Sequence, residues 1–193
     1  MKLTPKVELA IKTAARLHIS QTRKGDGQTP YIVHPFAVAI IVSEYTEDED
    51  VIAAALLHDV LEDTSYTASE LGRNFGQRVK EIVLSVSEPK AENGQKLGWR
   101  VRKNGYLKRL ESSNDEALLV CAADKINNLS SMMEEFQDQG VGMWIKFSAS
   151  AVEQLQFYKS VLEILEKRLD SEIVLKLRRI LEEARQLFLT APG

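Results

Sequence analysis

The sequence is poor in the features that mark several classes of protein. Its 193 residues include a single cysteine, Cys121, so a scaffold built on internal disulfides is excluded. The longest apolar runs, such as residues 51–57, fall far short of the ~18 residues that a membrane-spanning helix needs. The first residues mix Lys and Glu with apolar residues and do not resemble a secretory signal peptide. We therefore expect a cytoplasmic protein with no membrane partner.

Neither sign of charge dominates the chain. It has 25 Lys and Arg against 28 Asp and Glu, a formal net charge of −3, which predicts no nucleic-acid partner. The charges are nevertheless uneven, because residues 44–50 hold five acids and residues 93–110 hold six basic residues and no acid. The basic run, which includes Arg102 and Lys103, is either a solvated helix face or a rim that attracts anions.

Strand-like alternation and internal repeats are also missing, whereas apolar residues recur at helical spacing along nearly the whole chain. The pattern predicts an all-α, single-domain helical bundle over residues 1–193, with β-structure limited to a short hairpin at most. Loops are expected at 20–30 and 89–98, and a break at Gly140 and Gly142. We expect helices from Pro5, from His34, over roughly 47–63, 68–75, 77–88, 99–111 and 115–138, and two long C-terminal helices within 143–190.

One of the three histidines, His58, lies beside a carboxylate in apolar surroundings. His58 and Asp59 follow an apolar run, and Glu62 and Asp63 come one turn later, so on a continuous helix all four would share one face. Imidazole and carboxylate groups are costly to bury without partners, and a divalent cation would neutralise them. Mixed nitrogen and oxygen ligands suit Mn, Fe or Zn.

His34 and Asp124 are candidates for further ligands. Each lies at or within an apolar helical pattern, and with His58 and Asp59 they would give two imidazoles and two carboxylates. Such a set leaves coordination positions for water and substrate, as a catalytic metal site requires. Each also has a plainer interpretation, since His34 could cap a helix and Asp124 could pair with Lys125 at the surface.

Four segments extend this pattern over most of the chain. They read RKGDGQTPYIVHP at 23–35, AAALLHDVLEDT at 53–64, FGQRVKEIV at 75–83 and AADKINNL at 122–129. In this order they resemble the motifs of the HD superfamily of metal-dependent phosphohydrolases, and within it the RelA/SpoT-type hydrolase domain. That domain removes the 3′-diphosphate from ppGpp and pppGpp, and its stand-alone members are the small alarmone hydrolases. The resemblance covers about residues 7–165, and HDVLEDT is its most specific part.

The resemblance implies an HD-type helical fold and a Mn²⁺ site, with another divalent metal as an alternative. It implies that Glu62 and Asp63 orient and deprotonate the attacking water. The implied metal ligands are His34, His58, Asp59 and Asp124. The implied substrate contacts are Arg23, Lys24, Tyr31, Asn128 and Ser131, and Tyr158 is a further candidate whose alternative is a core aromatic.

The resemblance implies Mn-dependent hydrolysis of ppGpp or pppGpp to GDP or GTP and pyrophosphate. One alternative is the same chemistry on another nucleotide, such as the 2′-phosphate of NADPH, an adenine alarmone or a nucleoside phosphate. Another is a non-catalytic module that binds nucleotide and metal. A nucleotide and a second copy of the chain are the candidate partners of the protein. The sequence departs from the family pattern in a longer loop between Lys24 and Pro30, in Asn127 where a His is frequent, and after Gly142.

Overall fold

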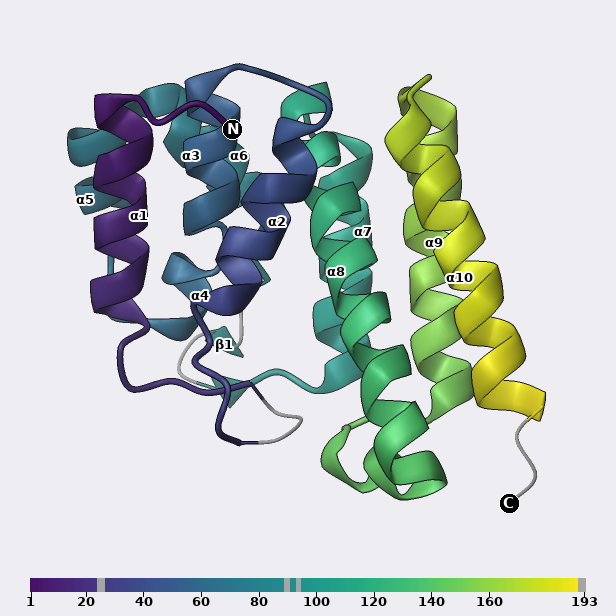
Figure 1. Cartoon of the computed structure of the whole chain (residues 1–193). Helices are drawn as coiled ribbons and strands as arrows, with labels where there is room; N and C mark the ends of the chain where they lie inside the picture. The colour runs from purple at the N-terminus through teal and green to yellow at the C-terminus, as the bar shows by residue number, and fades with distance from the viewer. Residues whose placement is uncertain (24–26, 89–90, 93–94, 191–193) are drawn as a thin grey trace.

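The structure, a computed structural model, describes residues 1–23, 27–88, 91–92 and 95–190, and helices dominate it (Figure 1). The all-α prediction is confirmed. Strands β1 (Ala91–Glu92) and β2 (Gln95–Lys96) pair antiparallel as the short hairpin that the sequence allows. The helices are α1 (Pro5–Leu17), α2 (Val33–Ser43), α3 (Glu49–Leu57), α4 (Val60–Asp63), α5 (Ala68–Phe75), α6 (Gln77–Val86), α7 (Trp99–Glu111), α8 (Asp115–Gln139), η1 (a 3₁₀ helix, Gly140–Lys146), α9 (Ala151–Arg168) and α10 (Glu172–Thr190).

Helix α3 forms the centre of the N-terminal half. Every residue from Val51 to Leu57 is buried, because α1, α2, α6 and α8 all pack against this helix. A helix that is apolar on all sides is stable only when it is surrounded in this way. Asp48 begins the helix by accepting a hydrogen bond from the N–H of Asp50 at 2.9 Å. The apolar run that the sequence displays is therefore the core of the fold.

Helix α8 joins the two halves of the molecule. It packs against α2, α3 and α6 on one side and against α9 and α10 on the other, and Figure 1 shows it between the two groups. Asn114 caps its first turn by accepting from the N–H of Ala117 at 2.9 Å. The helix ends where Gly140 adopts a φ of +60°, a conformation that favours glycine. Among the helices that the structure describes, none has both the length and the hydropathy for crossing a bilayer.

The helix expected over residues 47–63 is divided in two, which corrects the prediction of one continuous helix. His58 and Asp59 form a turn between α3 and α4. The Nδ1–H of His58 donates to the carbonyl oxygen of Ala55 at 2.8 Å, a group that a continuous helix would offer to the N–H of Asp59. A new turn then begins, in which the N–H of Asp63 bonds the carbonyl of Asp59 at 3.0 Å. The HD pair therefore lies at a bend and not on a regular helix face.

Candidate active site

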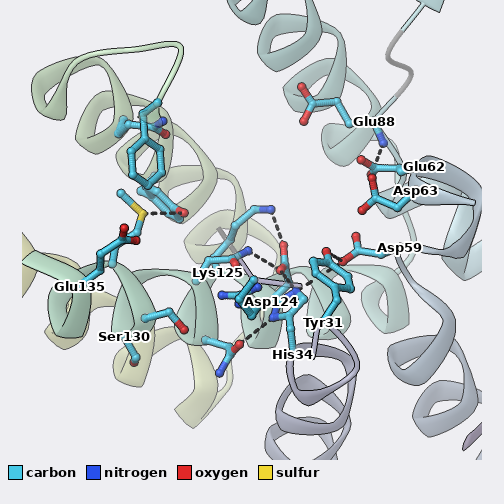
Figure 2. A pocket seen from close by; sticks show the side chains of 18 of the residues that line it. Tyr31, His34, Asp59, Glu62, Asp63, Glu88, Asp124, Lys125, Ser130 and Glu135 are labelled. Atoms are coloured by element: carbon cyan, nitrogen blue, oxygen red, sulfur yellow. Dashed lines mark hydrogen bonds and ion pairs between the residues drawn. The ribbon is translucent and has the colours of Figure 1, made fainter. Parts of the chain in front are cut away.

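A cavity of about 680 Å³ opens at the meeting point of α2, the α3–α4 turn, α7, α8 and α9. Its volume is in the range of pockets that bind small molecules and nucleotides. Four of the side chains predicted as metal ligands lie in its wall and converge on one another (Figure 2). Glu62 and Asp63 lie farther along the same cavity, on the side where Glu88 is found (Figure 2).

The donor atoms of the four predicted ligands are close together. His34 Nε2 lies 3.2 Å from His58 Nε2 and 3.2 Å from Asp124 Oδ1. His58 Nε2 lies 3.1 Å from Asp59 Oδ2. Ligand atoms of His34, His58 and Asp59 all fall within 4.8 Å of one another. Helices that are far apart in the sequence thus bring two imidazoles and two carboxylates to a single point.

The second nitrogen of each imidazole explains why these two rings suit a cation. His34 Nδ1 donates to the side-chain oxygen of Asn127 at 2.6 Å, and His58 Nδ1 donates to the carbonyl of Ala55 at 2.8 Å. Each Nε2 then carries its lone pair toward the other ring and toward the carboxylates. Lone pairs and carboxylates gathered in this way repel one another unless a cation or a proton lies between them. The donor set therefore fits a divalent metal ion.

Protons stabilise the cluster when no metal ion is bound. Burial alone would lower the pKa of His58, but the charge of Asp59 and the hydrogen bond with Asp124 outweigh it and raise that pKa well above its usual range. The pKa of His34 is raised by the same two carboxylates against the opposing effect of burial. Burial alone would raise the pKa values of Asp59 and Asp124. The charge of His58 nevertheless holds the pKa of Asp59 well below its usual range, and the charge of Lys125 does the same for Asp124.

Neighbouring side chains hold the two carboxylates in place. The hydroxyl of Tyr31 donates to Asp59. Asn128 donates its side-chain N–H to Asp124 Oδ1, and the Lys125 ammonium bonds the other oxygen of the same carboxylate. Partners of this kind orient metal ligands in many proteins. Tyr31 and Asn128, which were predicted as substrate contacts, therefore each also contact a candidate metal ligand.

Glu62 has surroundings unlike those of a surface carboxylate. One of its oxygens accepts a hydrogen bond from the main-chain N–H of Glu88 at 2.5 Å. Burial, together with the charge of Asp59, raises the pKa of Glu62 to about 8. A carboxyl group with this pKa is largely protonated at neutral pH, and its ionised form is a strong proton acceptor. Asp63 lines the same cavity, and its main-chain carbonyl accepts from Gln21 Nε2 at 2.6 Å.

The loop before α2 brings Arg23 and Tyr31 into the wall of the cavity. Its two arms are joined by a bridge between Thr22 and Pro30, and the N–H of Tyr31 bonds the carbonyl of Gln21 at 2.9 Å. The guanidinium of Arg23 lies 5.9 Å from the centre of the Tyr31 ring, and both side chains line the cavity. Lys24, also predicted as a substrate contact, lies outside the described residues.

The remaining predicted substrate contacts are on α8 and α9. Ser131 lines the cavity. Tyr158 is buried and also lines it, but its hydroxyl is directed to the sulfur of Met132 at 3.6 Å. The ring of Tyr158 thus belongs to both the core and the cavity wall, which combines the two alternatives that the sequence left open.

Sequence analysis missed several residues of the site. Asn127 stood out only as a departure from a family pattern, yet it orients His34. Glu88 gave no sequence signal, because it follows an ordinary amphipathic helix and its contact with Glu62 is made by the main chain. Arg102 and Lys103 appeared only as members of a basic run, but both line the cavity. Helical spacing from Tyr106, which is buried, was the one available indication that they face inward.

The chain is similar to known proteins over most of its length. A family model described as "HD domain" matches residues 10–144. The guanosine-3′,5′-bis(diphosphate) 3′-pyrophosphohydrolase MESH1 of Xenopus tropicalis is 36% identical over 160 residues, which cover 80% of this chain and 87% of the relative. The human protein of the same name is 35% identical over 149 residues, covering 74% of this chain and 80% of the relative. The bifunctional (p)ppGpp synthase/hydrolase SpoT of Escherichia coli K12 is 33% identical over 129 residues, 64% of this chain but 17% of that protein.

Solved structures show the same arrangement of helices. A metazoan orthologue of SpoT, described as hydrolysing ppGpp and having a role in starvation responses, superposes with a TM-score of 0.77 and 28% identity. That match covers 97% of this chain and 99% of the other. The protein lmo0812 of Listeria monocytogenes EGD-e gives a TM-score of 0.69 at 28% identity, covering 82% of this chain and 98% of the other.

Proposed function

This chain belongs to the HD domain family, and on that premise we propose that it hydrolyses guanosine 3′,5′-bis(diphosphate), ppGpp or pppGpp, to GDP or GTP and pyrophosphate. The observation that carries the proposal is the buried cluster in which two imidazole Nε2 atoms face each other at 3.2 Å between two carboxylates. The names of the relatives that the chain matches over most of their length support the choice of substrate.

We propose that the metal ion is Mn²⁺ and that the four converging side chains are its ligands. Mixed imidazole and carboxylate donors support manganese over a softer metal. When bound, a divalent cation lowers the pKa of water and polarises a phosphoryl oxygen. The ligand set consists of His34, His58, Asp59 and Asp124.

The proposed chemistry of the protein's own residues begins at Glu62. Its carboxylate accepts the proton of the attacking water, while the N–H of Glu88 holds that carboxylate in place. The water oxygen bonds to the phosphorus next to the ribose, the bond between that phosphorus and the ribose 3′-oxygen breaks, and the ribose oxygen takes up a proton. Asp63, beside Glu62 in the cavity wall, has the role of orienting the water.

The proposed substrate contacts come from the loop before α2 and from helices α8 and α9. Arg23, stacked near Tyr31, offers paired N–H donors for phosphate oxygens. Asn128 and Ser131 offer polar groups farther along the cavity, and Tyr158 offers the side of its ring. Lys24, which lies outside the described residues, completes the proposed set.

Two further parts of the proposal concern the protein in the cell. We place it in the cytoplasm, supported by its single buried cysteine, which suits a reducing compartment. We also propose that all of residues 1–193 form one hydrolase domain, supported by the single connected core to which α9 and α10 contribute.

A substrate panel tests the proposed function. Purified protein with Mn²⁺ is given ppGpp, pppGpp, NADPH, an adenine alarmone and a nucleoside monophosphate, and the products are separated by ion exchange. We expect pyrophosphate and GDP or GTP from the guanosine substrates, and no turnover after chelation or in His58→Ala. The proposal would be contradicted if phosphate is released from NADPH faster than pyrophosphate is released from ppGpp, or if turnover survives chelation.

A further inference from the structure

Two lysines of the cavity wall lie against the same aromatic ring. The Nζ of Lys103 is 4.4 Å from the centre of the Phe157 ring, and the Nζ of Lys125 is 5.8 Å from it. Lys125 also lies 4.8 Å from the centre of the Tyr106 ring. The side chains of Lys103 and Lys125 keep only 19% and 10% of their surface exposed, and both line the cavity. Ammonium groups are rarely buried to this extent without a specific anion nearby.

Among the described residues, the three cations of this group, Arg102, Lys103 and Lys125, form ion pairs with only two carboxylates, Glu88 and Asp124. Glu88 contacts Lys103 at 2.9 Å and Arg102 at 3.3 Å, so one carboxylate serves two cations. Lys125 is paired with Asp124, which is also one of the proposed metal ligands. Once a metal ion shares Asp124, that carboxylate neutralises Lys125 only in part. Burial, followed by the charge of Lys125, lowers the pKa of Lys103, and the carboxylate of Glu88 opposes this shift.

We propose that Lys103 and Lys125, supported by Arg102, bind the terminal phosphate of a diphosphate, the phosphate that is not attacked. This inference rests on the proposed function. Lys125 adjoins a proposed metal ligand and so lies next to the position of the attacked phosphate, and Lys103 lies beyond it along the same ring. The apolar faces of Phe157 and Tyr106 exclude water from this wall, which strengthens the attraction between ammonium and phosphate.

The inference names the class of substrate. A ribose 3′-diphosphate can occupy the metal site with one phosphate and the lysine pair with the other. A monophosphate, such as the 2′-phosphate of NADPH, reaches only one of these positions and leaves Lys103 without its anion. The site should therefore discriminate by the number of linked phosphates rather than by the sugar position alone.

Lys103→Met tests this discrimination, because it keeps the apolar stem against Phe157 and removes the charge. We expect kcat/KM for ppGpp to fall about 10- to 100-fold, the size typical for loss of a charged hydrogen bond. For the analogue of ppGpp that carries a single phosphate on the ribose 3′-oxygen, kcat/KM should fall less than about threefold, because this substrate has no terminal phosphate for Lys103 to bind. Lys108→Met on the exposed side of α7 is the matched control, and Lys103→Arg should restore much of the preference. An equal loss on both substrates, or no loss on either, overturns the inference.

Binding of inorganic pyrophosphate separates this inference from the proposed function. Calorimetry is done on metal-loaded protein at a fixed free cation concentration, with inorganic phosphate as the comparison. We expect wild type to prefer pyrophosphate by at least about tenfold and Lys103→Met to lose this preference. If the preference is present but ppGpp is not hydrolysed, the proposed function fails and the lysine pair stands. If ppGpp is hydrolysed but wild type does not prefer pyrophosphate over phosphate, the inference alone fails. This outcome is measured on wild type, so it does not depend on the folding of the variant.

Discussion

Burial and the nearby charge of Asp59 raise the pKa of Glu62 to about 8, against the opposing effect of the hydrogen bond from the main-chain N–H of Glu88. A bound divalent cation would favour the ionised form and bring this pKa down toward the range of an efficient base. We predict that Glu62→Gln keeps its metal content and loses turnover by roughly 10²- to 10⁴-fold, the usual contribution of a general base. Metal analysis and single-turnover rates on the same preparation check this.

The control for Glu62 is Glu81→Gln, an exposed position on α6 that should leave both quantities unchanged. A Glu62→Gln variant with full metal and near-normal turnover would transfer the role of base to Asp63 or to no side chain. Loss of metal in Glu62→Gln would instead make Glu62 a ligand.

Arg23 has a different expected signature, because it lines the cavity against Tyr31 and is not one of the four converging side chains. We predict that Arg23→Ala raises KM about tenfold or more and changes kcat less, as expected for a contact made equally in the ground and transition states. Steady-state kinetics on ppGpp at two salt concentrations measures it, with Arg73→Ala on the exposed side of α5 as control. A fall in kcat with constant KM would place Arg23 at the reacting phosphate.

Among the elements, α9 depends on a capping box at its first turn. Ser150 accepts from the N–H of Glu153, and the Glu153 carboxylate accepts from the N–H of Ser150 at 3.0 Å and from Arg100 on α7. We predict that Ser150→Ala lowers the free energy of unfolding by about 1 kcal/mol, the usual cost of losing an N-cap. Chemical denaturation measures it, and Ser43→Ala, whose hydroxyl bonds only a carbonyl within its own helix, is the comparison.

Ser150→Ala should leave the metal content unchanged, because α9 carries none of the four converging side chains. It should affect KM more than kcat, because Gln154 and Tyr158 on α9 form part of the cavity wall. An unchanged unfolding free energy would show that Glu153 and Arg100 hold this helix end without Ser150.

Helical periodicity was enough to predict most of these elements, because each helix buries an apolar stripe and many begin at a recognisable cap. It could not predict the bend at His58 and Asp59, which arises when a side chain takes a main-chain carbonyl. The motif residues identified the four side chains that converge in the cavity, but not Asn127 or Glu88. Asn127 acts across 93 positions in the sequence, and Glu88 acts on Glu62 through its N–H, which every residue except proline has.

At the scale of the whole molecule, the cluster links stability to pH. The pKa values of His34, His58 and Glu62 are raised in the metal-free fold, so the folded chain binds more protons than the unfolded chain near neutral pH. Their contribution to stability is present at low pH and is lost as pH rises through the folded pKa values. The lowered pKa values of Asp59 and Asp124 also stabilise the fold, but this contribution is lost as pH falls into the acid range.

We therefore predict that metal-free protein becomes less stable between about pH 6.5 and pH 9, by about 2 kcal/mol or more, since one unit of pKa shift corresponds to ~1.4 kcal/mol. Saturating Mn²⁺ should remove most of this loss by replacing the protons, and its binding should release protons to the buffer. Denaturation curves with and without chelator measure the first effect, and calorimetry in two buffers of different ionisation enthalpy measures the second. Stability independent of pH in chelator would contradict the assigned protonation.

Glu88 gives the molecule one more property, because it contacts two parts of the site at once. Its N–H holds Glu62, and its carboxylate holds Lys103 and Arg102. Any movement of the chain at the end of α6 would displace base and cations together, so substitutions on the two sides of Glu88 should not act independently. The combined effect of Glu62→Gln and Lys103→Met on kcat/KM is then smaller than the product of the separate effects, and a double-mutant cycle measures how tightly one residue couples proton transfer to phosphate binding.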